Sequence, residues 1–135
     1  MSQALIRAAL ETALNGMSPA VITSWENVAF TPPASTVPYQ RVTLLFAEPA
    51  DPVMGNALHV EQGILQVSLC YPLQQGDAAV RARVGLIRDT FYRTLTLTSG
   101  GTSVIISRTP EAGNGSAEAD RWVVPVRIRW FSNAT

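Results

Sequence analysis

The sequence predicts an α+β fold in which two helices pack on a mainly antiparallel sheet of about five strands. In two stretches, apolar residues recur every three or four positions, which is the period of an amphipathic helix. In several others, apolar and polar residues alternate or form short apolar runs between turn residues, as in strands. The expected element order is α-β-β-β-α-β-β, in a single domain that spans residues 1–135.

The first helix is expected to begin after Ser2, whose hydroxyl can cap it, and to end at Gly16. Pro19 prevents the helix from resuming, because proline has no N–H to donate. The apolar side of this helix is formed by Ile6, Leu10, Leu14 and Met17. A short strand is then expected over Val21 to Trp25.

Two further strands are expected before the second helix. The earlier one covers Tyr39 to Ala47, and its buried face is expected to hold Val42, Leu44 and Phe46. The connection that follows, Glu48–Ala57, is longer than a hairpin needs, so we expect it to be mobile. The next strand is central to the prediction, and its core face is formed by Leu65, Val67, Leu69 and Tyr71.

A tight turn leads from this central strand into the second helix. Pro72 and Gly76 bracket the turn, and Asp77 is expected to cap the helix with its carboxylate. The apolar side of the helix is expected to contain Val80, Val84, Ile87, Phe91 and Leu95. The sequence Ser99-Gly100-Gly101 ends this periodic pattern.

The C-terminal third is expected to form two strands joined by a flexible hairpin tip. The first is Val104 to Ser107, and the tip is Thr109 to Asp120, which is rich in glycine and small polar residues. The last strand is expected to face the core with Trp122, Val124, Val126, Ile128 and Trp130. Because Pro125 cannot donate to a ladder, we expect this strand to be an edge or to carry a bulge there.

The composition indicates a folded protein without a strong electrostatic field. Nearly half of the residues are hydrophobic (47%) and only 15% are charged, which excludes an intrinsically disordered chain. A low charged fraction fits either a surface covered by a partner or a large core. Ten basic and ten acidic residues give zero net charge, which disfavours general attraction to nucleic acid or anionic lipid. Every basic residue is arginine, which suits interfaces but also follows from genomic base composition.

Single cysteine and histidine residues limit the chemistry that the chain can perform. Cys70 is the only cysteine, so the sequence predicts neither an intrachain disulfide nor a cysteine-based metal site. The sequence shows no leader pattern and no apolar run of about 20 residues, so we expect a soluble intracellular protein that needs no membrane. The residues suggest no cofactor.

His59 and Glu61 are the first candidates for acid–base chemistry, since their spacing puts both on one face of a strand. No serine, second histidine or glycine-rich loop accompanies them in a catalytic arrangement. Trp122 and Trp130 share a strand face and could stack a base or a sugar, but a core position is favoured. An enzyme is therefore not expected.

The order of features along nearly the whole chain resembles that of the tail-terminator proteins of long-tailed phages and prophages. Trp25, Asn27 and Phe30 form a Trp-x-Asn-x-x-Phe motif before a proline-rich approach to a strand that begins with tyrosine. Later matching features are Gly63-Ile64-Leu65-Gln66-Val67, Tyr71-Pro72 with Gly76, an alanine-rich helix to Phe91, and a closing tryptophan-rich strand.

This resemblance implies an assembly protein with no cofactor and no reaction. Such a subunit forms a six-membered ring that caps the finished tail tube, stops its polymerisation and presents a surface for head attachment. The implied partners are other copies of the chain, the tail tube protein and a head-side connector protein, with DNA only passing through the lumen. The implied location is the virion tail or neck, after assembly in the host cytoplasm.

Two alternatives remain open. A head-to-tail connector or stopper protein also forms a ring of similar subunit size, and a small hydrolase or ligand-binding domain would use His59 and Glu61. For a ring, the candidates for the subunit interface are Arg127 and Arg129 on the outward face of the last strand, facing acidic groups of a neighbour. The acidic candidates are Glu111 and Glu118. Because exposed ion pairs are weak, subunits are expected to stay monomeric until they dock.

Overall fold

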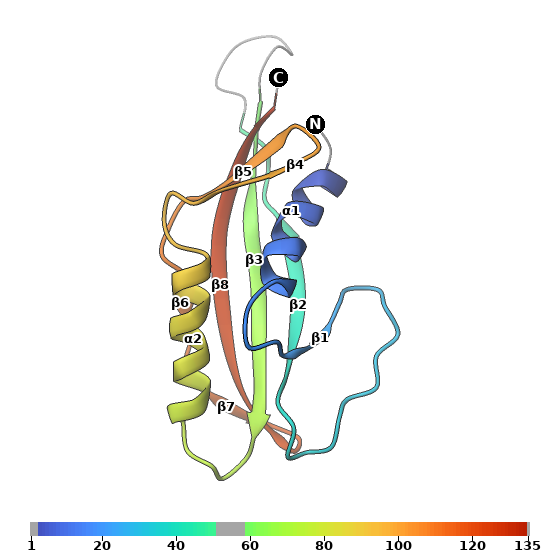
Figure 1. Cartoon of the computed structure of the whole chain (residues 1–135), viewed down its shortest axis with the longest axis vertical. Coiled ribbons are helices and arrows are strands. Elements are labelled where there is room, and N and C mark those ends of the chain that lie inside the picture. The colour runs from blue at the N-terminus through green and yellow to red at the C-terminus, as the bar shows by residue number, and fades with distance from the viewer. Residues whose placement is uncertain (1–2, 51–58, 135) are drawn as a thin grey trace.

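The computed structural model describes residues 3–50 and 59–134, and it has two helices on one side of a long, curved sheet (Figure 1). The helices are α1 (Gln3–Asn15) and α2 (Ala78–Thr90). The strands are β1 (Ile22–Ser24), β2 (Tyr39–Phe46), β3 (His59–Pro72), β4 (Thr96–Ser99), β5 (Thr102–Ile106), β6 (Glu111–Ala112), β7 (Ser116–Glu118) and β8 (Arg121–Ala134). The α+β class is confirmed.

The sheet order is β1-β2-β3-β8-β5-β4, and the short strands β6 and β7 also pair with β8. Every pairing is antiparallel except that of β1 with β2, which is parallel. The described residues thus form eight strands rather than about five. The additional ones are β4, β6 and β7, which have two to four residues each and give weak sequence signals.

The two longest strands, β3 and β8, form the centre of the sheet. They pair over 14 residues each, from His59 opposite Ala134 to Pro72 opposite Arg121. Alternate side chains of both strands point towards the helices, as the period-2 pattern predicts. The apolar ones with under 2% exposure are Leu65, Val67, Leu69, Val124, Val126, Ile128 and Trp130. The expected core face of β8 is confirmed, with Trp122 partly buried against the same core.

One hydrophobic core joins both helices to the same face of the sheet. The buried contributions of the helices are Ile6, Ala9, Leu10 and Leu14 from α1, and Val80, Val84 and Ile87 from α2. The spacing predicted for α1 is therefore correct, and the helix ends before Gly16, whose N–H donates to Thr12 O at 3.0 Å. Ser2, the expected cap, lies outside the described residues.

Two expectations for α2 are wrong. Asp77 occupies the N-cap position, but its carboxylate makes no capping hydrogen bond and accepts instead from side chains of Arg81 and Trp122. The helix also ends at Thr90, so Leu95 is not part of it. Thr94 has φ +82°, which a helix cannot contain, and the following threonine–leucine alternation forms β4.

The segment from Thr109 to Asp120 is not a flexible tip that projects from a hairpin. It runs back along β8, where β6 pairs Glu111 with Arg127 and β7 pairs Glu118 with Arg121. Backbone pairing of this kind satisfies polar groups that a free tip would expose to water. Of the other segment expected to be mobile, Ala50 pairs with Val60, and residues 51–57 lie outside the described part.

The expectation that β8 is an edge strand is wrong, because β8 has neighbours on both sides, but its ladder with the short strands is interrupted at Pro125, between the pairs of β6 and those of β7. The carbonyl of Pro125 accepts from Gly113 N at 2.8 Å, on the side of β6 and β7. The N and C=O of one strand residue point to the same side, so the missing donor faces the gap between these two short strands. Proline is tolerated there because no ladder bond is lost.

Candidate functional site

The second face of the sheet is not covered by either helix, because both pack on the core face (Figure 1). This helix-free face contains the polar residues Thr43, Gln66, Arg127 and Arg129 on β2, β3 and β8. It also contains a group of apolar side chains that are half-buried or exposed, formed by Leu45, Ile64, Ile105 and Phe131. Leu45 is 46% exposed. A mixed polar and apolar sheet face of this kind is suited to contact with another protein.

A depression of about 800 Å³ lies beside this face, and we call it the arginine cleft. It is lined by Arg93, Ser107, Arg108, Thr109, Glu111, Arg127 and Arg129. These residues come from the α2–β4 connection, the β5–β6 connection, β6 and β8. Three of the four interface candidates from the sequence, Arg127, Arg129 and Glu111, are thus brought together, whereas Glu118 is not.

The cleft forms where the chain leaves β8 between β5 and β6. Ser107 N donates to Arg129 O at 3.0 Å, which is the last backbone bond before the departure. Pro110 is buried, and its carbonyl accepts from Arg88 Nε at 3.0 Å, which ties the β5–β6 connection to α2. Pairing resumes at Glu111, opposite Arg127. The opening between these fixed points leaves room for a ligand.

Positive charge dominates the cleft. Arg127 contacts Glu111 at 3.5 Å, with side chains 38% and 59% exposed. Within residues 3–50 and 59–134, no acidic group lies within 4 Å of the guanidinium groups of Arg93, Arg108 or Arg129. Exposed guanidinium groups without an acidic neighbour can donate to carboxylate or phosphate oxygens.

An acidic turn lies at the far end of β8, between β7 and β8, and contains Glu118, Ala119 and Asp120. Ala119 has φ +51°, so the backbone reverses sharply there. Glu118 contacts Arg41 at 3.4 Å with 54% of its side chain exposed, and the Asp120 side chain is 67% exposed. The carboxylates of the turn are therefore presented to solvent.

Arg121 is a buried arginine whose role the sequence did not indicate. Its guanidinium donates to the carbonyls of Val37, Pro33 (2.9 Å) and Ala34 (2.8 Å), and it stacks 4.9 Å from the centroid of the Tyr39 ring. Arg121 thus fastens the proline-rich β1–β2 connection to the end of the sheet. From the sequence, an arginine next to an acidic turn is expected to be exposed to solvent. The buried position of Arg121 therefore had no sequence signal.

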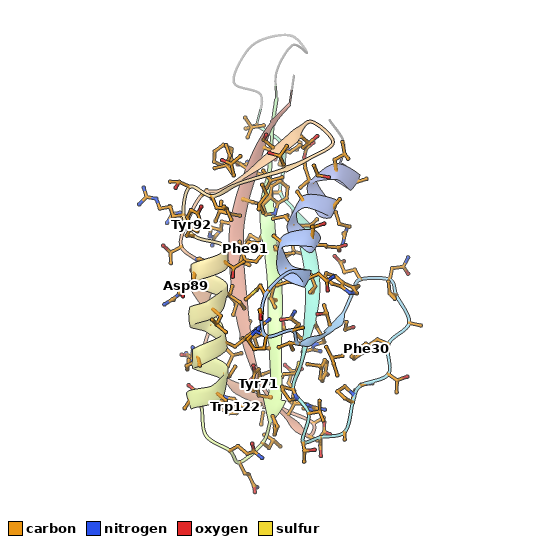
Figure 2. All side chains as sticks on the ribbon, in the orientation of Figure 1. Phe30, Tyr71, Asp89, Phe91, Tyr92 and Trp122 are labelled. Atoms are coloured by element: carbon orange, nitrogen blue, oxygen red, sulfur yellow. The ribbon has the colours of Figure 1, made fainter. Side chains whose placement is uncertain are left out.

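Asp77, Arg81 and Trp122 form a polar group at the start of α2, where Figure 2 shows Trp122 close to the first turn of the helix. Asp77 accepts from Arg81 Nε at 2.7 Å and from Trp122 Nε1 at 2.9 Å. The hydrogen bond from Arg81, followed by that from Trp122, lowers the pKa of the Asp77 carboxyl from its usual 3.8. These contacts join α2 to β8 and have no catalytic arrangement.

A second depression, of about 500 Å³, lies between α1 and the Trp-x-Asn-x-x-Phe motif. It is lined by Arg7, Glu11, Trp25, Glu26, Asn27 and Val28. Arg7 contacts both Glu11 and Glu26, at 3.2 and 3.1 Å. Glu26 also accepts from the backbone N–H of Leu44 at 2.6 Å, which closes part of the outer edge of β2 beyond β1. Its single arginine contacts both glutamates of the lining, so the charged groups of this depression are already paired with one another and we interpret it as structural.

The alternative catalytic pair, His59 and Glu61, lies on β3. Glu61 is a half-buried residue of β3 opposite Ser132, and His59 lies on the same strand, with its side chain outside the described residues. Glu61 is not among the described residues that line the arginine cleft or the second depression. Among the described residues, no group of three or more histidine, cysteine, aspartate or glutamate side chains could hold a metal ion. Likewise, neither described helix is long and apolar enough to cross a membrane.

Comparison with known proteins agrees with the resemblance seen in the sequence. A family model described as phage tail terminator protein matches residues 5–130. The chain belongs to the phage tail terminator protein family. It is thus a structural protein of a phage tail. A solved structure is similar over its whole length, with a TM-score of 0.79, 26% sequence identity, and coverage of 100% of this chain and 97% of that chain. No curated protein matches.

Proposed function

We propose that the chain forms a ring, expected to contain six copies, that caps the end of the tail tube. The ring ends tube polymerisation and offers its other side to a head-side connector protein, while DNA passes through the lumen. The observation that carries this proposal is the match of the tail-terminator family model to residues 5–130, nearly the whole chain.

The surfaces of the subunit support a role in assembly. The helix-free sheet face exposes apolar side chains such as Leu45, and the arginine cleft and the acidic turn lie on separate parts of one subunit. When two complementary surfaces lie at different places on one chain, copies of the chain can bind head to tail. Such an arrangement closes into a ring when the rotation between neighbouring copies divides a full turn evenly. The charges at these sites are exposed, so free subunits are expected to associate weakly.

The experiment that tests this function is polymerisation of purified tail tube protein with and without the chain. We expect tubes of indefinite length without it, and shorter tubes with a ring at one end when it is present. Light scattering of the chain alone and with tubes then reports whether the ring forms only on the tube. Unchanged tube lengths at a molar excess of the chain would contradict the proposal.

A connector or stopper protein is the second candidate, because it also forms a ring. The same assay separates the two functions. A connector leaves tube length unchanged and instead binds the portal end of filled heads, whereas a terminator binds the tube. Pelleting the chain with tubes or with tail-less heads shows which structure carries it.

A further inference from the structure

We propose that the arginine cleft is a receptor for the acidic turn of a neighbouring copy, so that Glu118 and Asp120 of one subunit bind Arg93, Arg108 and Arg129 of the next. This inference rests on the proposed ring. It names the surfaces that join its subunits, and adds Arg93 and Arg108 to the candidates found in the sequence.

The cleft selects for oxyanions. It contains four of the ten arginines of the chain, and the one acidic residue among its described lining, Glu111, contacts Arg127. The other three guanidinium groups have no acidic neighbour within 4 Å among the described residues, so they can donate pairs of hydrogen bonds to carboxylates. The polar side chains of Ser107 and Thr109 supply further donors at the rim.

A short acidic protein segment fits the cleft better than nucleic acid does. Because the whole chain has zero net charge and the described lining carries three net positive charges, the remaining residues sum to three net negative charges, which disfavours binding of an extended polyanion. Among the described residues, the lining contains no aromatic side chain on which a base could stack. A compact pair of carboxylates is attracted by the arginines of the cleft and is too short to reach the negative charges outside it.

The acidic turn has the chemistry and the exposure that this site requires. Glu118 and Asp120 are two residues apart, on either side of the sharp reversal at Ala119, and their side chains are 54% and 67% exposed. Their partners within the chain are distant or exposed, with Arg41 at 3.4 Å and Arg121 Nε at 3.9 Å. Exposed pairs of this kind contribute little and exchange readily for a better site.

The turn cannot reach the cleft of its own subunit. Arg121 follows the turn directly, and Arg127 lies six residues further along the same extended strand, a separation of roughly 20 Å. Figure 1 shows β7 at the lower end of the sheet and β6 well above it beside α2. A contact between turn and cleft must therefore join two copies. Tyr92, 51% exposed and adjacent to Arg93, lies where it can pack against such a neighbour.

A charge-swap experiment tests this contact. The cleft variant is Arg93→Glu with Arg108→Glu, and the turn variant is Glu118→Arg with Asp120→Arg. Each alone places like charges across the contact. In an equimolar mixture, however, every cleft can meet a turn of opposite charge. We expect each variant alone to lose ring formation on tail tubes, because its subunits associate with one another at least tenfold more weakly than wild-type subunits do. We expect the mixture of the two variants to recover ring formation. A control with the same exposed setting, Gln3→Glu with Gln75→Glu, should behave as wild type.

The outcomes separate the contact from the proposed function. If wild-type protein caps tubes and the cleft variant also caps them, or if mixing restores nothing, the contact is wrong and the capping function stands. If wild-type protein does not cap tubes, the function fails. In that case, chemical cross-linking at high protein concentration and low salt compares wild type, each variant and the mixture, and equal dimer yields overturn the contact. Binding of a 20-base-pair duplex by wild type and its loss in the cleft variant would show a nucleic-acid site instead.

Discussion

Arg121 shows how one buried charge can fix a long irregular connection. It is 3% exposed and donates to three backbone carbonyls of the β1–β2 connection, which contains few regular backbone bonds of its own. Hydrogen bonds from a charged donor are stronger than neutral ones, and loss of the donor leaves the carbonyls without their partner. The stability of this end of the sheet therefore depends on a single side chain.

We expect Arg121→Ala to destabilise the protein by about 2–4 kcal/mol, because several charge-assisted bonds are lost together. Arg121→Lys should recover only part of this, since an ammonium group cannot span the three carbonyls as a guanidinium does. Urea denaturation measures the free energy of unfolding of both variants. The exposed Arg108→Ala is the control and should change this free energy by less than about 0.5 kcal/mol. Equal stability of Arg121→Ala and wild type would contradict this role.

Asp77 predicts a pH dependence at the start of α2. Its pKa is lower in the folded chain than the usual 3.8, so its contribution to stability is present above about pH 4 and is lost as the pH falls through the folded value. In Asp77→Asn this part of the acid dependence should disappear, while stability at pH 7 decreases. Thermal unfolding of wild type and Asp77→Asn between pH 2.5 and 7 checks this prediction. If the melting temperatures of the two proteins change in parallel over that range, Asp77 does not cause the acid dependence.

Cys70 is expected to be unreactive in the folded protein. The thiol is 1% exposed on the helix-free side of β3, and burial raises its pKa above the usual 9.0, which lowers the thiolate fraction at neutral pH. Reaction with a thiol reagent at pH 8 should be at least about 100-fold slower in buffer than in denaturant. A reaction at the same rate in both conditions would show that the thiol is accessible.

At the scale of elements, the pairing of β3 with β8 depends on a match between a glycine and a tryptophan. Gly63 lies opposite Trp130, and a Cβ added at Gly63 would meet the Leu45 carbonyl oxygen and approach the Trp130 ring to 2.9 Å. Trp130 is 1% exposed and contacts the Phe46 ring edge-on, with centroids 5.6 Å apart. The glycine therefore provides the space that the indole fills.

We expect Trp130→Ala to cost about 3–5 kcal/mol, because it removes the largest side chain of the core and leaves a cavity. Gly63→Ala should also destabilise the protein, by overpacking at the same point. Phe131→Ala, at a half-buried position on the other face, is the control and should cost less. Thermal melts decide the matter, and a Trp130→Ala protein that melts within a degree or two of wild type would overturn this placement.

The sequence predicted the regular elements well and the connections poorly. The core faces of β3, β8 and α1 follow from simple periodicity, because each buries one side of a long element. The β4–β5 hairpin was missed because Leu95 continued the helical spacing of α2. The Gly100-Gly101 pair, whose residues adopt positive φ in the structure, was the turn signal for this hairpin. The pairing of β6 with β8 joins segments that are not adjacent in the chain, and β7, although it forms a tight hairpin with β8, is too short to show an alternating pattern. Separation along the chain also hid the cleft, whose arginines come from three separate segments.

At the scale of the whole molecule, the two sides of the sheet serve different purposes. The helix-bearing side contains the main core, and the helix-free side combines a small buried cluster around Cys70, exposed apolar residues and the arginine cleft. A neutral chain of this design attracts neither DNA nor membranes strongly over its whole surface, yet it offers local complementary charges to another copy. In the ring that we propose, assembly would depend on many weak contacts made at once, with the tube end as the template.

Charge reversal on β8 tests whether this side of the sheet forms the subunit contact. Arg127 and Arg129 lie on the helix-free face and line the cleft, and Arg127 contacts only the exposed Glu111 among acidic groups of the described residues. We expect Arg127→Glu with Arg129→Glu to retain the fold, because neither side chain is buried, but to fail in capping. Tails assembled with this variant should be overlong or lack heads, as measured by electron microscopy. Circular dichroism and a thermal melt serve as the folding control. If correctly folded variant protein gives tails of normal length, the subunit contact lies elsewhere on the molecule.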